Sequence, residues 1–301
     1  MKIMIKILIA MMFMLGGSLV HASTKIEFVY YYPPGGGTDR YTAPLVESLT
    51  AQNVEVSRKF FKSCSEAVSY VNNNPEGRLI VASSDDMHPE KDNRCPSQKT
   101  SNLQWVSNIM SAPLYLCTVP SKSNLTLEDL LSGQQYNIGS LTSEIAWLPI
   151  NAFVKYNKND LNVRLVPYEG GGALRIAAMS GRDLDFVVTG NDAPVFMKEG
   201  ANCIASTHKD NYLNLPHLGS YVKDIEFPNF SLDLSFWGIN SLSSTQEDAL
   251  IQAFNSETNT SFLKTREGVQ HKGIASNLSK KEQYESVMLQ IYALDFLREN
   301  K

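Results

Sequence analysis

Short apolar runs alternate with amphipathic segments along most of the chain. The first run, residues 25–30 (K-I-E-F-V-Y), is β-branched and aromatic, as expected for a buried strand. The next segment carries Tyr41, Leu45 and Leu49 at the spacing of one helix face. The alternation continues and predicts an α/β fold with mainly parallel sheets flanked by helices. Strands are predicted near 25–30, 54–61, 78–82, 103–119, 136–139, 163–168, 184–189, 202–206 and 232–240, and helices near 38–49, 64–71, 126–131, 144–156, 173–179, 194–199 and 245–254.

The order of these elements divides the chain into two lobes. The length of 301 residues exceeds what one compact core usually holds. The first lobe is expected to comprise 23–118 and 230–301, and the second 119–229. The apolar segment 103–119 is expected to leave the first lobe as one strand, and 232–240 to return to it. The amphipathic segment 279–298 is predicted to be a helix that packs on a lobe.

The first 22 residues have the pattern of a cleavable signal peptide. Lys2 and Lys6 precede an apolar run from Ile7 to Val20, and small residues follow at Val20-His21-Ala22. A membrane anchor is the alternative, but the run is shorter than the ~20 apolar residues that a spanning helix needs. We therefore expect a soluble protein exported to the periplasm.

Composition and charge narrow the class of protein. With 43% hydrophobic and 19% charged residues, the chain is globular. Its 27 basic and 31 acidic residues give a net charge of −4, and no basic tract occurs. Nucleic acid is therefore not an expected partner.

Four cysteines follow the predicted signal peptide: Cys64, Cys95, Cys117 and Cys203. An even number in an exported chain favours two disulfides, and no C-x-x-C spacing indicates a zinc or redox site. Cys64 is the nearest partner for Cys95. Cys117 and Cys203 lie on the strands that lead into and out of the second lobe. We therefore predict the bridges Cys64–Cys95 and Cys117–Cys203.

The strongest candidate for a binding element is the stretch 30–40, Y-Y-Y-P-P-G-G-G-T-D-R. Pro33 and Pro34 end the first strand, and the three glycines permit positive φ and close approach of a ligand. Thr38 is predicted to cap the helix that follows. Such a strand–glycine loop–helix junction directs backbone N–H groups at one point, where carboxylates and phosphates bind. The alternative is a tight turn with nothing bound.

Two further turns repeat this arrangement in the second lobe. They follow the strands 136–139 and 163–168, at S-L-T-S (140–143) and E-G-G-G (169–172). Ligands of open α/β sheets bind beyond the carboxyl ends of the strands. If the two lobes face each other with those ends inward, the three turns line one cleft. The alternative is three independent turns on separate edges.

Catalysis finds little support in the sequence. No G-x-S-x-G or H-E-x-x-H motif occurs, and the histidines lack metal-ligand spacing. Asp183 and Asp185 could form a glycosidase pair, but solvated acids at a strand start are far commoner. We expect no catalytic residue, no metal and no cofactor, and a protein that binds rather than an enzyme.

Four motifs, taken in order, resemble one family. Y-P-P-G-G-G-T-D at 32–39 resembles the F/Y-P-A-G-G-G-T-D signature of the Bug-type substrate-binding proteins of tripartite tricarboxylate transporters. The segment 125–131 resembles the family's s-L-x-E-L helix. V-P-Y-E-G-G-G-A from 166, continuing to 186, resembles V-P-Y-K-G-x-x-P-A…L-x-G-Q-V-D. F-W-G-I at 236–239 resembles the returning W-x-G-L strand.

The resemblance covers nearly the whole mature chain and implies a fold and a set of site residues. The fold is the two-lobed periplasmic binding protein of type II, with two crossover strands and a ligand cleft between the lobes. The family's ligand carboxylate contacts the first glycine loop and the turns of the second lobe. The matching positions here are Gly36, Gly37, Thr38 and Asp39 in the first loop; Ser140, Thr142 and Ser143, with Gly139, in the loosely aligned middle turn; and Tyr168, Gly170 and Gly171 in the third.

Several positions depart from the family pattern. The family's N-R-x-G-A-G-G after the second strand is replaced by R-K-F-F-K-S-C from Arg58. Glu144 stands where the middle turn is usually neutral, and Glu169 replaces a common lysine. With Asp39, three acids could surround the cleft, countered by Arg40 and Arg175. Glu144 could instead only complement its helix dipole. Acids that face the cleft would suit an amine-bearing ligand such as an amino acid.

The resemblance implies a periplasmic receptor that captures a small carboxylate-bearing metabolite, an organic acid or an amino acid. The implied partners are the membrane permease subunits of a tripartite tricarboxylate-type transporter, and the receptor itself is expected to be a monomer. The alternative is an extracytoplasmic receptor that presents its ligand-bound state to a membrane sensor kinase.

Overall fold

The computed structural model describes residues 24–83, 86–87, 95, 102–141, 144–157, 162–168, 171–181, 183–190, 192–211, 213–222, 226–239, 242–265, 281, 285, 293 and 296. The predicted signal peptide lies outside these residues. Within them, no helix combines the length and the apolar character needed to cross a membrane.

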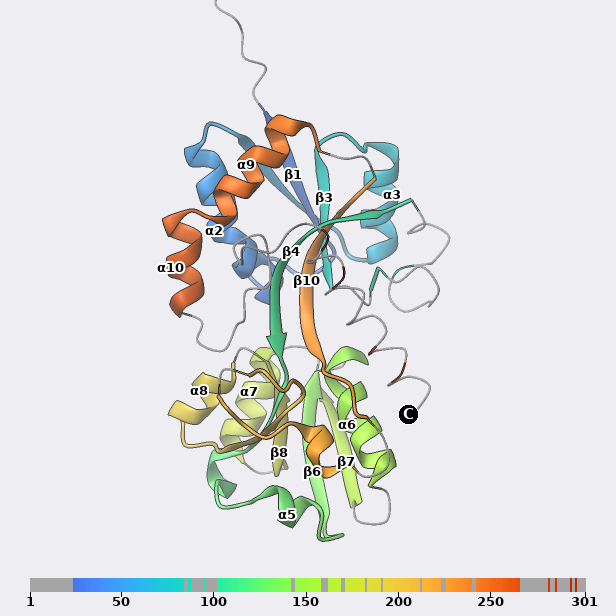
Figure 1. The fold of residues 1–301 in the computed structure, drawn as a ribbon, viewed down its shortest axis with the longest axis vertical. Helices are drawn as coiled ribbons and strands as arrows, with labels where there is room; N and C mark the ends of the chain where they lie inside the picture. Colours follow the sequence, from blue (N-terminus) through green and yellow to red (C-terminus); the bar gives the residue numbers. More distant parts are fainter. Residues whose placement is uncertain are drawn as a thin grey trace, which may run out of the picture.

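The first five-stranded sheet has the order β2-β1-β3-β10-β4. β1 pairs in parallel with β2 and β3, and β10 runs antiparallel to β3 and β4. Helices α2, α9 and α10 cover one face of this sheet and α3 covers the other (Figure 1). The strands are β1 (Lys25–Tyr30), β2 (Glu55–Phe60), β3 (Arg78–Ser83), β4 (Gln104–Pro113) and β10 (Ser231–Gly238), and the helices are α2 (Gly37–Ala51), α3 (Cys64–Asn73), α9 (Ser244–Phe254) and α10 (Glu257–Thr265).

The second five-stranded sheet repeats this topology with the order β7-β6-β8-β5-β9. β6 pairs in parallel with β7 and β8, while β5 runs antiparallel to β8 and β9. Both sheets therefore consist mainly of strands that run in one direction, with a single reversed strand. The elements are β5 (Tyr115–Thr118), η1 (Pro120–Lys122), α5 (Leu127–Leu130), β6 (Gln135–Leu141), α6 (Glu144–Tyr156), β7 (Asn162–Tyr168), α7 (Gly171–Ser180), β8 (Phe186–Thr189), α8 (Ala193–Lys198), β9 (Cys203–Ser206) and η2 (Leu218–Tyr221).

Each sheet is the centre of one lobe; β4 leads from the first lobe toward the second, and β10 leads back to the first (Figure 1). The segment 103–119, predicted to be one strand, is two strands in different sheets. β4 ends at Pro113, which has no backbone N–H to donate to a ladder. β5 begins two residues later, at Tyr115, and pairs within the second sheet. The change of sheet therefore comes at Leu114, ahead of the expected lobe boundary at 118.

The buried Thr207 joins the two crossings where they enter the second lobe. Its Oγ1 accepts the N–H of Leu114 at 2.9 Å and lies 2.8 Å from the carbonyl oxygen of Phe230, to which it donates. The backbone repeats these links, since Thr207 N–H donates to Leu114 O and Phe230 N–H donates to Thr207 O. One residue thus holds both connections together.

The end of the chain departs from the expected division into lobes. Ala293 and Phe296 are helical, as predicted for this segment, and both pack with the core of the second lobe. The ring of Phe296 stacks on Tyr156 of α6. The expectation that all of 230–301 belongs to the first lobe is therefore wrong for these residues. Sequence also missed α10, because its residues, E-T-N-T-S-F-L-K-T, form no clear apolar stripe.

Both predicted disulfides are present, Cys64–Cys95 in the first lobe and Cys117–Cys203 in the second. Cys64 begins α3 and packs with Cys95 against β1 and β3. Cys117 and Cys203 face each other on the paired strands β5 and β9. The second bridge therefore ties an edge strand to its neighbour.

Candidate functional site

The three predicted turns all follow strands of the parallel groups. Neighbouring parallel strands end at one edge of a sheet, so the turn after β1 lies beside the end of β3, and the turns after β6 and β7 lie together. In Figure 1, β1 begins at the far end of the first lobe and β6 points toward that lobe. The carboxyl edges of the two sheets therefore face each other.

The glycine loop ends at a helix whose cap differs from the prediction. The N-cap of α2 is Gly36, with no side-chain hydrogen bond, and Thr38 is already the second helical residue. A left-handed φ occurs at Gly35 (74°), the one glycine of the three that requires it. The prediction of a Thr38 cap is therefore wrong, and of the three glycines that permit a positive φ, Gly35 adopts it. A cap without a side chain leaves the first turn of α2 open to an incoming acceptor.

Polar contacts of Asp39 and Arg40 hold the shape of this loop. The Asp39 carboxylate accepts the Gly35 N–H at 2.8 Å and pairs with Arg58 Nη1 at 2.9 Å. Arg40 Nε donates to the Gly35 carbonyl at 2.9 Å. Asp39 is therefore countered by Arg58, whereas the sequence pointed to Arg40 and Arg175; Arg175 pairs with Glu199. Asp39 lies within the predicted site, where its hydrogen bond and ion pair fix the conformation of the loop.

A buried hydrogen-bond cluster, missed by sequence reasoning, lies at the same edge. One oxygen of Asp86, Oδ2, accepts the hydroxyls of Tyr31 (2.6 Å), Tyr32 (2.5 Å) and Ser83 (2.8 Å). Burial raises the pKa of both tyrosine hydroxyls well above the ordinary value, and the carboxylate charge adds to this effect. Both hydroxyls therefore stay protonated and donate. A run of polar residues directly after a buried strand was the available signal.

The second-lobe residues lie where the turns were expected, but the structure describes only some of them. Ser140 is in β6, is buried, and donates to the Leu141 carbonyl. Tyr168 ends β7 and Gly171 begins α7. Thr142, Ser143 and Gly170 lie outside the described residues, as do Glu169 and the side chain of Glu144.

The surroundings of Gly171, Gly139 and Asp185 indicate what these residues do near the turns. A Cβ on Gly171 would lie 3.6 Å from Asp192 Oδ2, which places the carboxylate after β8 beside the turn after β7. A Cβ on Gly139 would approach Leu174 and Leu184 to within 2.8 Å, so Gly139 serves the packing of α7 on the sheet. Asp185 accepts from Lys122 and from the Asn137 N–H, which is a structural role.

No protein-family model matches the chain, and no curated protein matches its sequence. Solved structures do match its fold. Rpa4515 of R. palustris, solved with adipate, is 15% identical with a TM-score of 0.71, over 93% of this chain and 98% of that one. MatC of Rhodopseudomonas palustris, solved with malate, is 12% identical with a TM-score of 0.65, over 93% and 99%.

The periplasmic binding protein BugD is also similar, with 12% identity and a TM-score of 0.68 over 93% of this chain and 98% of that one. The similarity extends across both lobes and both crossing strands, as the motif resemblance implied. The chain therefore has the two-lobed α/β fold of the Bug-type periplasmic solute-binding proteins.

Proposed function

We propose that the protein is a Bug-type periplasmic solute-binding receptor. It captures a small carboxylate-bearing metabolite, an organic acid or an amino acid, between its lobes. It delivers this ligand to the membrane permease of a tripartite tricarboxylate-type transporter, and it is exported through the signal peptide 1–22. In this proposal the protein binds and does not catalyse.

One observation carries the proposal: α2 begins at an uncapped glycine, at the edge of the first sheet that faces the second lobe. The backbone N–H groups of the first helical turn and the positive end of the helix dipole favour a carboxylate there. The fold neighbours solved with adipate and malate support the same chemistry. Gly36, Gly37 and Thr38 would contact the ligand, and Asp39 would hold the loop in shape.

The facing turns of the second lobe would complete the site. Ser140, Thr142, Ser143, Tyr168, Gly170 and Gly171 are its proposed residues. Closure would bend the chain at the two crossings, near Leu114 and Phe230, which Thr207 holds together. Movement at these two points would bring the carboxyl edges toward each other.

A thermal-shift screen of organic acids and amino acids tests the proposal, using mature protein that has been unfolded, stripped of ligand and refolded. A ligand that binds only the folded state adds ~2.7 kcal/mol of stability at 100 times its dissociation constant. We expect at least one small carboxylate to raise the unfolding temperature in a concentration-dependent way. That ligand should also reduce the radius of gyration in small-angle scattering. A screen in which no carboxylate stabilises the protein would overturn the proposal.

A further inference from the structure

The two crossing strands carry polar residues on one buried face. In the register of β4 and β10, Asn108 pairs with Ser235 and Ser111 pairs with Asp233. Their exposed fractions are 1%, 0%, 4% and 3%. The residues that alternate with them on β10, including Leu234 and Phe236, face the opposite way and pack with α2 and α9. A row of polar side chains thus lies inside the first lobe, toward the second.

Asn108 is the member of this row whose side chain bears on ligand binding. Neither Nδ2 nor Oδ1 of its amide finds a hydrogen-bond partner among the residues that the structure describes. The Oγ of Ser235, its register partner on β10, accepts a hydrogen bond from Trp105 Nε1 at 3.3 Å. An amide buried with both donor and acceptor unmet destabilises a fold, so its presence requires another explanation.

The register places Asn108 at the candidate site. Ser235 pairs with Ala82 on one side and with Asn108 on the other. Ala82 is the penultimate residue of β3, so Asn108 is level with the carboxyl edge of the parallel strands. Ala82 and Tyr31 pack in one cluster on the face that α3 covers. Asn108 therefore lies on the same face and at the same edge as the Tyr31–Asp86 cluster.

We propose that Asn108 is a ligand-binding residue that selects a carboxylate with a hydrogen-bond donor beside it, as in a hydroxy acid or an amino acid. The proposal rests on the proposed function and specifies its ligand. Nδ2–H donates to the carboxylate, and Oδ1 accepts from the neighbouring hydroxyl or ammonium group. An unsubstituted dicarboxylate leaves Oδ1 unmet. The buried carboxylates of Asp86 and Asp233 on this side of the sheet also favour a ligand that brings a donor.

The test uses three probes with the same four-carbon dicarboxylate skeleton: succinate, malate and aspartate. They carry hydrogen, hydroxyl and ammonium at the same carbon. Wild-type protein is expected to bind malate or aspartate at least about tenfold more tightly than succinate in calorimetry, because a site built to accept a hydrogen bond discriminates against an analogue that lacks the donor. Asn108→Leu keeps the volume and removes both amide atoms. It should reduce that preference to within about threefold and raise the unfolding temperature of the ligand-free protein.

Ser107→Ala is the matched control. Ser107 is the preceding residue of β4, is 1% exposed, and also has an unmet side-chain oxygen among the described residues. Its register partner is Phe236, so it lies on the opposite face. Its removal should not change the probe affinities.

The outcomes separate this inference from the proposed function. If a probe binds but Asn108→Leu keeps the wild-type preference and affinity, Asn108 is structural and only the inference fails. If Asn108→Leu lowers the unfolding temperature of the ligand-free protein, the amide has a structural partner and the inference fails again. If no probe and no other carboxylate binds, both proposals fail.

Discussion

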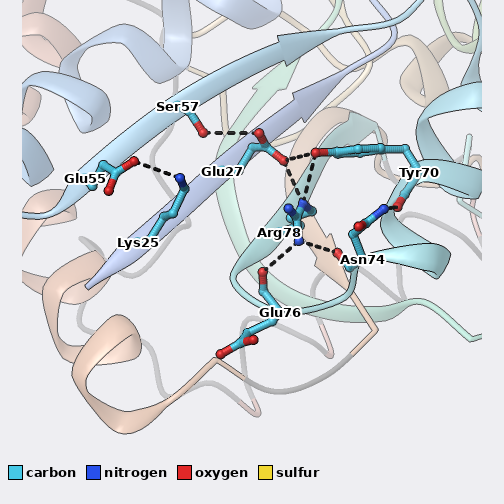
Figure 2. Close-up of polar contacts among 8 residues, drawn as sticks. All are labelled: Lys25, Glu27, Glu55, Ser57, Tyr70, Asn74, Glu76 and Arg78. Atoms are coloured by element: carbon cyan, nitrogen blue, oxygen red, sulfur yellow. Dashed lines mark hydrogen bonds and ion pairs between the residues drawn. The ribbon is translucent and has the colours of Figure 1, made fainter. Parts of the chain in front are cut away.

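Two polar regions on the same face of the first sheet are built in opposite ways. At the amino-terminal edge, Glu27 accepts hydrogen bonds from Arg78 Nε (2.7 Å), Tyr70 (2.8 Å) and Ser57 (3.2 Å), and Arg78 Nη1 also donates to the carbonyls of Asn74 and Glu76 (Figure 2). At the carboxyl edge, the amide of Asn108 meets no partner among the described residues.

The difference distinguishes polar groups that stabilise the fold from polar groups that are available to bind a ligand. The Glu27 cluster is partly buried and paired at both carboxylate oxygens, so it joins β1, β2 and β3 where these strands begin. Tyr70 adds an aromatic face to Lys59 (3.8 Å) and Arg78 (5.2 Å). Asn108 is more deeply buried, and its side chain makes no comparable hydrogen bonds with the described residues. If this difference holds, substitutions in the paired region should lower stability, and substitutions at the carboxyl edge should lower ligand affinity.

The largest effect is expected from breaking the paired cluster with Arg78→Met. It removes the charged partner of Glu27 and two bonds to backbone carbonyls, and hydrogen bonds to charged groups are each worth about 1.5–3 kcal/mol. We expect a loss of that order in the free energy of unfolding, measured by urea denaturation, with ligand affinity unchanged.

Lys25→Met is the control for this prediction. Lys25 pairs with Glu55 at 2.8 Å in the same region (Figure 2), but both side chains are more than half exposed. Exposed pairs contribute little, so its loss should be much smaller. Equal losses from the two substitutions would mean that the Glu27 cluster is no more structural than a surface ion pair.

The next effect is on binding. A Cβ on Gly37 would meet no atom within 4 Å, and this residue has no left-handed φ. Gly37→Ala should therefore leave the fold intact while adding a methyl group where, in the proposed function, the ligand carboxylate would approach. We expect at least tenfold lower affinity, about 1.4 kcal/mol, for whichever carboxylate gives the largest thermal shift. Calorimetry measures the affinity, and urea denaturation should show no loss of stability.

Two companion variants sharpen this prediction. Gly35→Ala places a side chain at φ 74° and should cost ~1 kcal/mol or more of stability. Thr38→Val removes a hydroxyl that caps nothing, so it should weaken binding without changing the unfolding temperature. If Gly37→Ala and Thr38→Val both bind with wild-type affinity, the glycine loop is structural, and the turn that follows Ser140 becomes the leading candidate.

A smaller effect is expected from breaking the ion pair between Arg58 and Asp39, which holds the same loop. Arg58→Met removes the cationic partner of Asp39 but leaves the bond from the Gly35 N–H. Because the Arg58 side chain is 42% exposed, the pair should contribute about 0.2–1 kcal/mol. Affinity should fall by less than in Gly37→Ala, and the difference from wild type should shrink at 1 M salt, where the Debye length is about 3 Å. A loss larger than that of Gly37→Ala would make Arg58 a direct ligand contact.

Much of the fold could be predicted from the sequence because each strand and helix has a local signal. The runs at β1, β3 and β8 are apolar and bounded by turn residues, and Cys117 and Cys203 lie on strands that the topology brings together. The break at Leu114 was not predicted, because 103–119 is rich in apolar and β-forming residues on both sides of Pro113 and the change of sheet depends on tertiary pairing.

The candidate site was predicted less completely, for a physical reason. The glycine loop and its strand–turn–helix setting are local features. Asp86 accepts a hydrogen bond from the hydroxyl of Tyr31, which is 55 residues away in the sequence. That contact exists only because β1 and β3 are neighbours. Asn108 lies in a strand-like segment and is distinguished by an amide that meets no partner among the described residues, which no sequence pattern reports.

The smallest expected effect is a pH dependence that distinguishes the two regions. Partial burial raises the pKa of Glu27, but the hydrogen bonds from Tyr70 and Arg78 outweigh it, so the pKa lies below its ordinary value of 4.5. A carboxyl whose folded-state pKa is lowered stabilises the fold fully above the unfolded-state pKa, and that stability is lost as the pH falls through the lowered value.

The free energy of unfolding of wild type should therefore exceed that of Glu27→Gln by an amount that is constant at neutral pH and shrinks as the pH falls below about 4.5. Urea denaturation of both proteins at each pH removes the contribution of all other carboxyls from the difference. The amide of Asn108 does not titrate, so the difference between wild type and Asn108→Leu should not change over the same pH range. A Glu27→Gln difference that stayed constant to pH 3 would mean that the hydrogen bonds do not favour the charged carboxylate. The amino-terminal cluster would then hold the sheet by shape and neutral hydrogen bonds alone.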